Sequence, residues 1–221
     1  SAPQPTPIPE ATTAPAPAAE PATAPSPAAP TVEAVVDFGD APDGDSAGYS
    51  ATSIQAVFPS LAAGGGLQIA QAGFETLGIA VSEEDDAKLT NADEDDGITG
   101  MTVSMDTAPL ASVRFEVGVV PEAPAATRYI NVLIDLNGDG AWGGAAAGGE
   151  PEWAVRNQAI EVTPGNIAGL ATEEFAFSNG MRLPDRAWMR VLLTRTEVTG
   201  DDWDGSGDFE FGEVEDYLVT L

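Results

Sequence analysis

The sequence contains no cysteine and no histidine. The lack of cysteine excludes disulfide bonds and thiolate metal sites. The lack of histidine removes the commonest general base and, together with the missing cysteine, the usual ligands of zinc. A serine nucleophile activated by a histidine base is excluded for the same reason. Hard cations with oxygen ligands are the metal ions that this composition suits.

Basic residues are also scarce. The chain has 8 Lys and Arg against 36 Asp and Glu, a formal net charge of -28 over 221 residues. Nucleic acid and anionic membrane surfaces require a basic face, so neither is expected as a partner. Such a charge disfavours the compact state through self-repulsion unless cations offset it. No run approaches the roughly 20 apolar residues of a membrane span, so membrane insertion is not expected.

The first 31 residues form a separate, Pro- and Ala-rich segment. Residues 1–30 contain ten Pro and ten Ala, with no aromatic and no basic residue. This composition buries too little surface to offset the entropy of ordering, so we expect an extended polyproline-like arm. It serves either as a linker or as an element that packs against a neighbouring copy in a filament. The start SAPQ is typical of a mature secreted product, although a fragment of a longer chain begins in the same way.

Residues 32–221 are richer in aromatic and β-branched residues and predict one folded domain. Residues 51–63 and 67–80, rich in Ala, Leu and Gln, predict one or two short helices or irregular loops. No long amphipathic helix alternates with strands, so we expect an all-β fold, an antiparallel β-sandwich of jelly-roll or Ig-like type with long acidic loops. Short apolar or alternating runs predict strands at 112–120, 128–136, 159–162, 187–194 and 217–221.

The stretch IDLNGDGAW, residues 134–142, follows one of these predicted strands. Oxygen-bearing side chains stand at alternate positions, namely Asp135, Asn137 and Asp139. With Gly140 next, this is the spacing of the first half of an EF-hand calcium loop, in which alternate side chains converge on the ion. The carbonyl of Ala141 offers a fourth ligand. The pattern therefore predicts a calcium site.

The EF-hand pattern does not continue beyond this point. Position twelve, where an EF-hand has a bidentate Glu, is Ala146, and a strand rather than a helix precedes the loop. The closing acid is therefore expected elsewhere, with Glu150 as the first candidate and Glu152 as the second. The alternative is a solvated hairpin turn, because Asn-Gly and Asp-Gly are also hairpin signals.

Three further acidic clusters are either calcium ligands or solvated loops, because like charges at this density repel. The run DDWDGSGDFE, residues 201–210, has acids at alternate positions, among them Asp204 and Asp208. NADEDDGI includes Asp95, and DFGDAPDGD includes Asp40. We take these four residues as additional candidate ligands.

Taken together, the motifs of residues 36–221 resemble the GEVED domain, a family of secreted and surface-attached bacterial proteins. The motifs are, in order, DFGDAPD, LG followed by EEDD, DEDDGI, IDLNGDGAW with GGE, AWMRVLLTR and GEVEDYLV. The chain departs from the family in the permuted acids of DEDDGI and in the insertion GGAAAGG after Trp142. The resemblance implies a β-sandwich-like, calcium-associated extracellular module with adhesive or structural roles.

Half of the eight basic residues lie between positions 182 and 195. A strand at 187–194 places Met189, Val191 and Leu193 on its core face and Arg190 on the other face. Arg190 then either binds a carboxylate of the GEVED segment, such as Glu213 or Glu215, or stays exposed without a fixed partner.

The leading functional hypothesis is a non-enzymatic, calcium-stabilised module secreted to the bacterial cell surface. It would act in adhesion or in a matrix or filament assembly, through its sheet edges and its arm, with other copies, surface proteins or glycans as partners. One alternative is a calcium-dependent carbohydrate-binding module that uses Trp as a sugar platform. Another is a glycoside hydrolase, which requires only paired carboxylates and a cleft. The four Trp are scattered along the sequence, and most are expected to be core or loop anchors.

Overall fold

The computed structural model describes residues 35–49, 53–81, 83–89, 97–104, 110–143, 151–176 and 184–221. These residues belong to one compact unit, Thr31–Leu221. The predicted arm at residues 1–31 lies outside the described residues. Among the residues described, no helix is long and apolar enough to cross a membrane.

The described secondary structure is almost entirely β. A single 3-10 turn, Ala62–Gly64, lies between β3 and β4. The strands are β1 (Val35–Phe38), β2 (Asp43–Ser46), β3 (Gln55–Val57), β4 (Gln68–Ala72), β5 (Glu75–Leu77), β6 (Ile98–Ser104), β7 (Leu110–Val119), β8 (Arg128–Ile134), β9 (Trp153–Ile160), β10 (Asn166–Ala171), β11 (Phe175–Ala176), β12 (Arg186–Thr194) and β13 (Asp208–Thr220).

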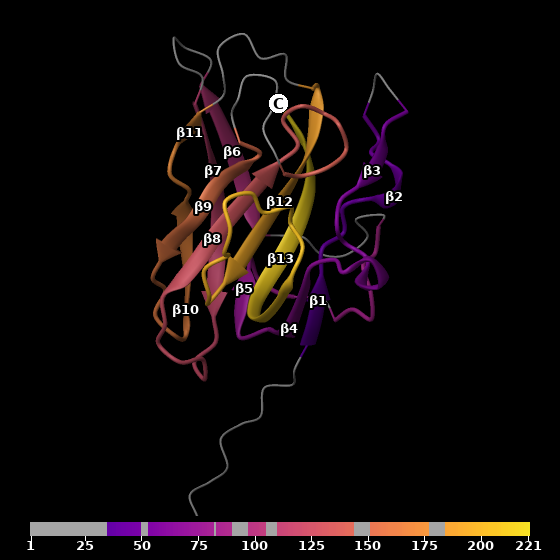
Figure 1. Ribbon diagram of the computed structural model, residues 1–221. Helices are drawn as coiled ribbons and strands as arrows, with labels where there is room; N and C mark the ends of the chain where they lie inside the picture. The colour runs from indigo at the N-terminus through magenta and orange to yellow at the C-terminus, as the bar shows by residue number, and fades with distance from the viewer. Residues whose placement is uncertain are drawn as a thin grey trace, which may run out of the picture. The chain divides into compact units, whose positions relative to one another are not determined.

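The strands form two large sheets and one hairpin (Figure 1). The first sheet has six strands in the order β1-β4-β13-β12-β8-β9. The second has five strands around β7, which pairs with β10 and β11 along one edge and with β5 and β6 along the other. β2 and β3 pair with each other. Every pairing is antiparallel except that of β13 with β4, which is parallel.

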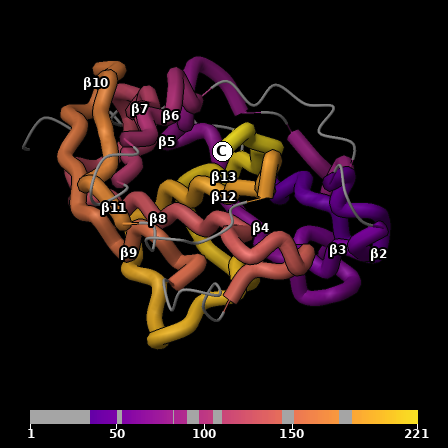
Figure 2. The backbone as a smooth tube through the Cα atoms, turned by 90° about the horizontal axis from the view of Figure 1, so that it is seen from above, coloured from indigo at the N-terminus to yellow at the C-terminus, as the bar shows by residue number. Residues whose placement is uncertain are grey.

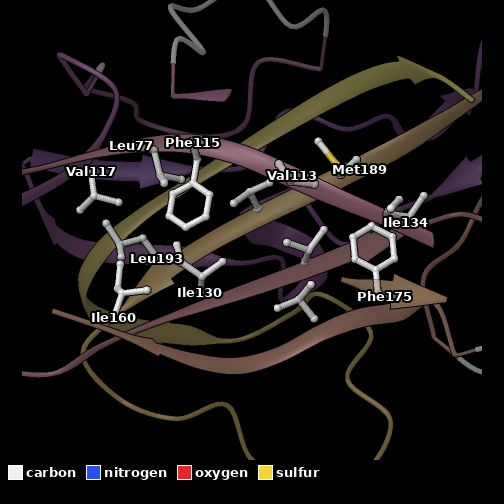
Figure 3. Close-up of a cluster of buried hydrophobic side chains, with 14 of the residues drawn as sticks. Leu77, Val113, Phe115, Val117, Ile130, Ile134, Ile160, Phe175, Met189 and Leu193 are labelled. Carbon is white, nitrogen blue, oxygen red and sulfur yellow. The ribbon is translucent and has the colours of Figure 1, made fainter. Parts of the chain in front are cut away.

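A hydrophobic core fills the space between the two sheets. β7 contributes Val113, Phe115 and Val117, and β8 and β12 contribute residues such as Ile130 and Leu193 from the facing sheet. Figure 3 shows Phe115 directed toward Ile130 and Leu193, and the view from above separates the row containing β8 and β12 from the row containing β7 (Figure 2). Two sheets packed through one apolar layer confirm the predicted all-β sandwich.

A second core covers the opposite face of the six-stranded sheet. Trp188 and Leu192 of β12 pack there against Phe58 and Leu67, which follow the hairpin β2–β3 and precede β4. Within β12 only Arg186 is exposed. The predicted core face of β12, formed by Met189, Val191 and Leu193, is confirmed in the first core. Both faces of this strand are therefore buried.

The expectation of helices at 51–63 and 67–80 is wrong for the described residues there. They form β3, β4, β5 and one short 3-10 turn. The physical reason is tertiary: β4 lies between β1 and β13 and buries Ile69 and Ala72 in the second core, so pairing and burial override a weak helical propensity. The predicted strand at 217–221 is confirmed, since β13 extends to Thr220.

Candidate metal centre

The loop after β8 is organised around the buried carboxylate of Asp135. Its Oδ1 accepts hydrogen bonds from the N–H groups of Gly138 at 2.7 Å and Asp139 at 3.1 Å, and its Oδ2 accepts one from Gly140 at 2.9 Å. The Asp135 N–H donates to the carbonyl of Trp188 at 3.0 Å, which fixes the start of the loop to β12. One carboxylate thus turns the chain back on itself.

The other predicted side chains of this loop face outward. Asn137 and Asp139 are exposed, and the Asn137 Nδ2 donates to the Asp139 Oδ2 at 3.0 Å. The Asn137 Oδ1 accepts from the Asp139 N–H at 2.7 Å, and the Asp139 Oδ1 accepts from the Ala141 N–H at 3.0 Å. The structure therefore brings the three predicted side chains into one loop, in which their oxygens accept hydrogen bonds from backbone N–H groups.

Gly140 lets another segment cross the loop closely. Its φ is 87°, and a Cβ built on it would lie 2.7 Å from Ile54 Cγ2 and 2.9 Å from the carbonyl oxygen of Gln55. The Gly140 carbonyl accepts a hydrogen bond from the Val57 N–H at 2.8 Å. The glycine therefore serves both the turn and its contact with β3.

Tyr49 reaches the same carboxylate from a distant part of the chain. Its hydroxyl donates to the Asp135 Oδ2 at 2.6 Å and accepts from the Trp188 N–H at 3.1 Å. Burial raises the pKa of Tyr49, and the charge of Asp135 raises it further. Our reading of the sequence missed this residue, because nothing in its local pattern points to a loop 86 positions away.

Glu152, which directly precedes β9, contacts the loop. Its Oε1 accepts a hydrogen bond from the Asn137 N–H at 3.3 Å. The side chain is fully buried, and its Oε2 has no hydrogen-bond partner. Burial raises the pKa of Glu152 to about 8, and the charges of Asp135 and Asp139 add to the shift. The second candidate for the closing acid therefore lies in the site, whereas the first, Glu150, lies outside the described residues.

Asp135 and Glu152 are two buried carboxylates without a counter-charge in the part of the chain that the structure describes. The four ion pairs formed by the described residues all lie elsewhere. Burial raises the pKa of Asp135 too, with a contribution from Asp139. Burying charges without a cation is unfavourable, so this arrangement favours either protonation or a bound positive ion.

The donor set can be tested against a calcium ion. Within the described ranges, no group of three or more Asp or Glu side chains is arranged to hold a metal ion as it stands. The buried, unpartnered Oε2 of Glu152 next to Asp135 is nevertheless the acceptor that a cation would satisfy. Calcium accepts carboxylate, amide and carbonyl oxygens together, and Asn137 and Ala141 supply the last two kinds. The donor types in this loop are those that calcium accepts, although the described carboxylates do not form a group of three.

The remaining predicted ligands do not join this site as a group. Asp204 is exposed and its Oδ1 accepts from the N–H and hydroxyl of Ser206 at 3.0 and 2.6 Å. Asp208 is exposed at the start of β13. Asp40 is buried and accepts the Lys88 N–H at 2.7 Å. Asp95 lies outside the described residues.

The GEVED segment, residues 212–216, lies in the middle of β13 and its acids bind the protein itself. Arg190 and Asp216 stand directly opposite each other and form a fully buried bidentate pair, with Nε–Oδ1 at 2.8 Å and Nη2–Oδ2 at 2.6 Å. Glu213 accepts the N–H of Leu77, and Glu215 accepts that of Gly97 at 3.0 Å. The motif is a set of internal cross-links.

The expectation that Arg190 binds a carboxylate of the GEVED segment is confirmed, but the partner is Asp216 rather than Glu213 or Glu215, and the exposed alternative is wrong. The physical reason is the two-residue period of a strand. Glu213 and Glu215 stand opposite Leu193 and Val191, whose side chains face the first core, so they lie on the other side of the sheet from Arg190. Of the three acids in the GEVED segment, only Asp216 lies on the same face of the sheet as Arg190.

The comparisons with known proteins agree with the motif. The family model of the GEVED domain matches residues 129–220. The chain carries a GEVED domain. Comparison with curated proteins and with solved structures gave no match.

The matched part of the GEVED domain depends on residues that precede it. The match contains β8 to β13, with Asp135, Glu152 and the Arg190–Asp216 pair. Yet Asp37 accepts the Val214 N–H at 2.8 Å, and Asp216 accepts the Ala41 N–H at 2.8 Å. Strands β1, β4 and β7 also complete its two sheets. The folded unit is therefore larger than the matched segment.

The four Trp of the GEVED domain lie together in the second core. None is more than 7% exposed, and each indole N–H donates to a protein oxygen. A sugar platform needs an exposed aromatic face. The proposal of a Trp platform is therefore wrong, whereas the expectation of core or loop anchors is confirmed. The residues are Trp142, Trp153, Trp188 and Trp203.

Proposed function

We propose that this GEVED domain is a calcium-stabilised, non-catalytic structural module of a secreted or surface-attached bacterial protein. The observation that carries the proposal is the unpartnered, buried Oε2 of Glu152 beside the buried carboxylate of Asp135. A folded protein with a net charge of -28 gains stability wherever a cation neutralises two buried acids. The site is therefore a place where calcium and folding are coupled.

Asp135 and Glu152 are the inner ligands in this proposal. Asp139, the amide oxygen of Asn137 and the carbonyl of Ala141 complete the set from the exposed side of the loop. When bound, the ion supplies charge neutralisation and a fixed loop geometry. Extracellular modules bind calcium with dissociation constants of roughly 10⁻⁴ to 10⁻³ M. Such an affinity suits a domain that works outside the cell.

The module's work in this proposal is adhesion or assembly. We regard it as a β-sandwich of jelly-roll or Ig-like type with calcium-binding loops, preceded by an extended Pro- and Ala-rich arm. Its partners are other copies, surface proteins or glycans, and the arm contributes to a filament or matrix. The absence of cysteine agrees with a scaffold that uses ions rather than disulfides for stability. A glycan array and a hydrolase screen test the carbohydrate-binding and enzymatic alternatives.

Calorimetric titration with calcium tests the metal site. The protein should release or absorb heat on binding, and its melting temperature should rise, because an ion at about ten times its dissociation constant stabilises the fold by about 1.4 kcal/mol. Glu152→Gln keeps the acceptor for the Asn137 N–H but loses the charge, so it should abolish most of the melting shift. Asp45→Ala, at an exposed position of β2, is the matched control. Equal heats and equal shifts in all three proteins would leave only an acidic turn.

A further inference from the structure

On the edge of β13 that faces away from β12, no described strand pairs with residues 218–220. β12 pairs with β13 continuously, from Gly212 opposite Thr194 to Thr220 opposite Arg186. On its other side, β13 pairs with β4 only through Asp208, Phe209 and Phe211. The pairing of β13 with β4 therefore ends well before Leu218 and Thr220.

The direction of the backbone groups at this edge follows from two hydrogen bonds. The Val214 N–H donates to Asp37 Oδ2 at 2.8 Å and thus points away from β12. The Leu221 N–H donates to the carbonyl of Asp185 at 3.4 Å, on the β12 side. Because the register between the strands does not shift, the N–H and C=O groups of Leu218 and Thr220 point toward the open edge. They are ladder groups that no described strand satisfies.

A groove lies over the ends of β12 and β13 on this side of the molecule. Its volume is about 540 Å³, within the range of sites that hold peptides and other ligands. Trp188, Tyr217 and Leu218 line it from the six-stranded sheet, and Pro42 and Leu89 line it from the neighbouring segments. The hairpin β2–β3 lies to the same side of β13 in Figures 1 and 2.

Among the described residues that line the groove, Arg186 is the one that carries a charge. This side chain is exposed and takes part in none of the four ion pairs that the described residues form. In a chain with a net charge of -28, a cation that forms no ion pair with the described residues, at an apolar groove, is well suited to a carboxylate from outside. The charge therefore specifies an acidic ligand.

We propose that this groove takes up an extended segment of a partner chain as an additional strand on the open edge of β13. Main-chain hydrogen bonds to Leu218 and Thr220 give the affinity, and the apolar lining and Arg186 give the selectivity. The segment is about four residues long, apolar at alternate positions and acidic at one position on the face of the sheet that carries Arg186. This proposal specifies the partner for the assembly role proposed above and rests on that role, but it does not require the calcium ion.

Fluorescence anisotropy with the full-length chain tests strand uptake. The probe is a fluorescein-labelled heptapeptide, Glu-Val-Thr-Val-Ser-Val-Thr, and the comparison peptides carry either N-methylated amides at alternate residues or Gln in place of Glu. The parent peptide should bind saturably below 1 mM, and the N-methylated peptide should not bind. Absence of saturable binding, or equal binding of the N-methylated peptide, would overturn the proposal.

Two variants locate the site. Thr220→Pro removes an N–H that faces the open edge, a position where proline is tolerated in strands, and should abolish binding. If Thr220→Pro does not fold, hydrogen exchange of the Leu218 amide in the parent protein replaces it, with slower exchange expected when peptide is present. Arg186→Gln should weaken binding of the Glu peptide at least tenfold and that of the Gln peptide less than twofold. Arg114→Gln, at an exposed position of β7, is the control.

The titrations are run with calcium and with a chelator, and calcium binding is measured separately by calorimetry. Peptide binding without a calcium heat would refute the metal site alone. A calcium heat without peptide binding would refute strand uptake alone. Unchanged peptide binding by Arg186→Gln and Thr220→Pro would place the peptide elsewhere and overturn the proposal.

Discussion

Replacing Glu152 by Gln should make the metal-free protein more stable at alkaline pH. Glu152 is fully buried beside Asp135, and its pKa is raised to about 8 from an ordinary 4.5. In the metal-free protein its ionised form is therefore destabilised by burial and by the negative charge of Asp135. Gln has the same shape and keeps an acceptor for the Asn137 N–H, but it carries no charge at any pH.

The sign follows from proton linkage. Between pH 4.5 and about 8 the folded protein holds the Glu152 proton while the unfolded chain has lost it. The unfolded state thus binds fewer protons, so stability falls as pH rises through this window. A difference of one in pKa between the folded and unfolded states corresponds to about 1.4 kcal/mol. The rise in the Glu152 pKa therefore lowers the free energy of unfolding by at most roughly 5 kcal/mol. Bound calcium should oppose this loss, because it favours the ionised form and releases the proton.

Urea unfolding at pH 5, 6.5 and 8, in chelator and in millimolar calcium, measures these effects. Other acids also titrate, so the informative quantity is the difference between the parent protein and Glu152→Gln at each pH. In chelator this difference should grow toward pH 8 in favour of the variant, and in calcium it should shrink or reverse. A difference that stays constant with pH, with and without calcium, would refute the assignment of a buried, strained carboxylate.

Three further changes to the chain test the roles of the buried ion pair, of the end of β13 and of a glycine in this strand. Asp216→Asn should cost about 3–5 kcal/mol in urea unfolding, because it leaves the buried Arg190 guanidinium without its counter-charge; a loss below about 1 kcal/mol would contradict this. Removing residues 217–221 should cost several kcal/mol through lost ladder and core contacts, so a parental melting temperature would show that the segment is peripheral. Gly212→Ala should destabilise by about 1–3 kcal/mol, since its Cβ would lie 1.8 Å from the Leu193 carbonyl oxygen, whereas Gly169→Ala, with nothing within 4 Å, should not.

The strands that could be predicted from the sequence are those with an uninterrupted apolar or alternating run. The segments at 112–120, 128–136 and 187–194 correspond to β7, β8 and β12, because each buries one face in the core between the sheets. In β9 only the end was predicted. Asn157 has a φ of 47° there and the pairing with β8 shifts its register, which breaks the period that the prediction depends on.

The candidate site was predictable in part for a similar reason. Alternate spacing over residues 135–139 locates a loop that turns on its own side chains, and the structure places all three in that loop. The contributions of Tyr49 and of the β3 segment were not predictable, because they arrive from positions about 80 residues earlier and no local pattern marks them. Sequence spacing therefore indicates the residues of the loop itself, whereas the residues that contact the loop from elsewhere in the chain are known only from the structure.

The acids of the GEVED segment show why charge density alone does not identify ligands. A strand sends alternate side chains to opposite faces, so Glu213 and Glu215 reach backbone N–H groups of Leu77 and Gly97 while Asp216 reaches Arg190. All three are buried, and each has a donor within the protein. Glu152 differs because one of its oxygens is buried without a donor. Buried carboxylates whose donors are internal stabilise the sandwich, and the proposed calcium ion would neutralise the buried Oε2 of Glu152, which has no such donor.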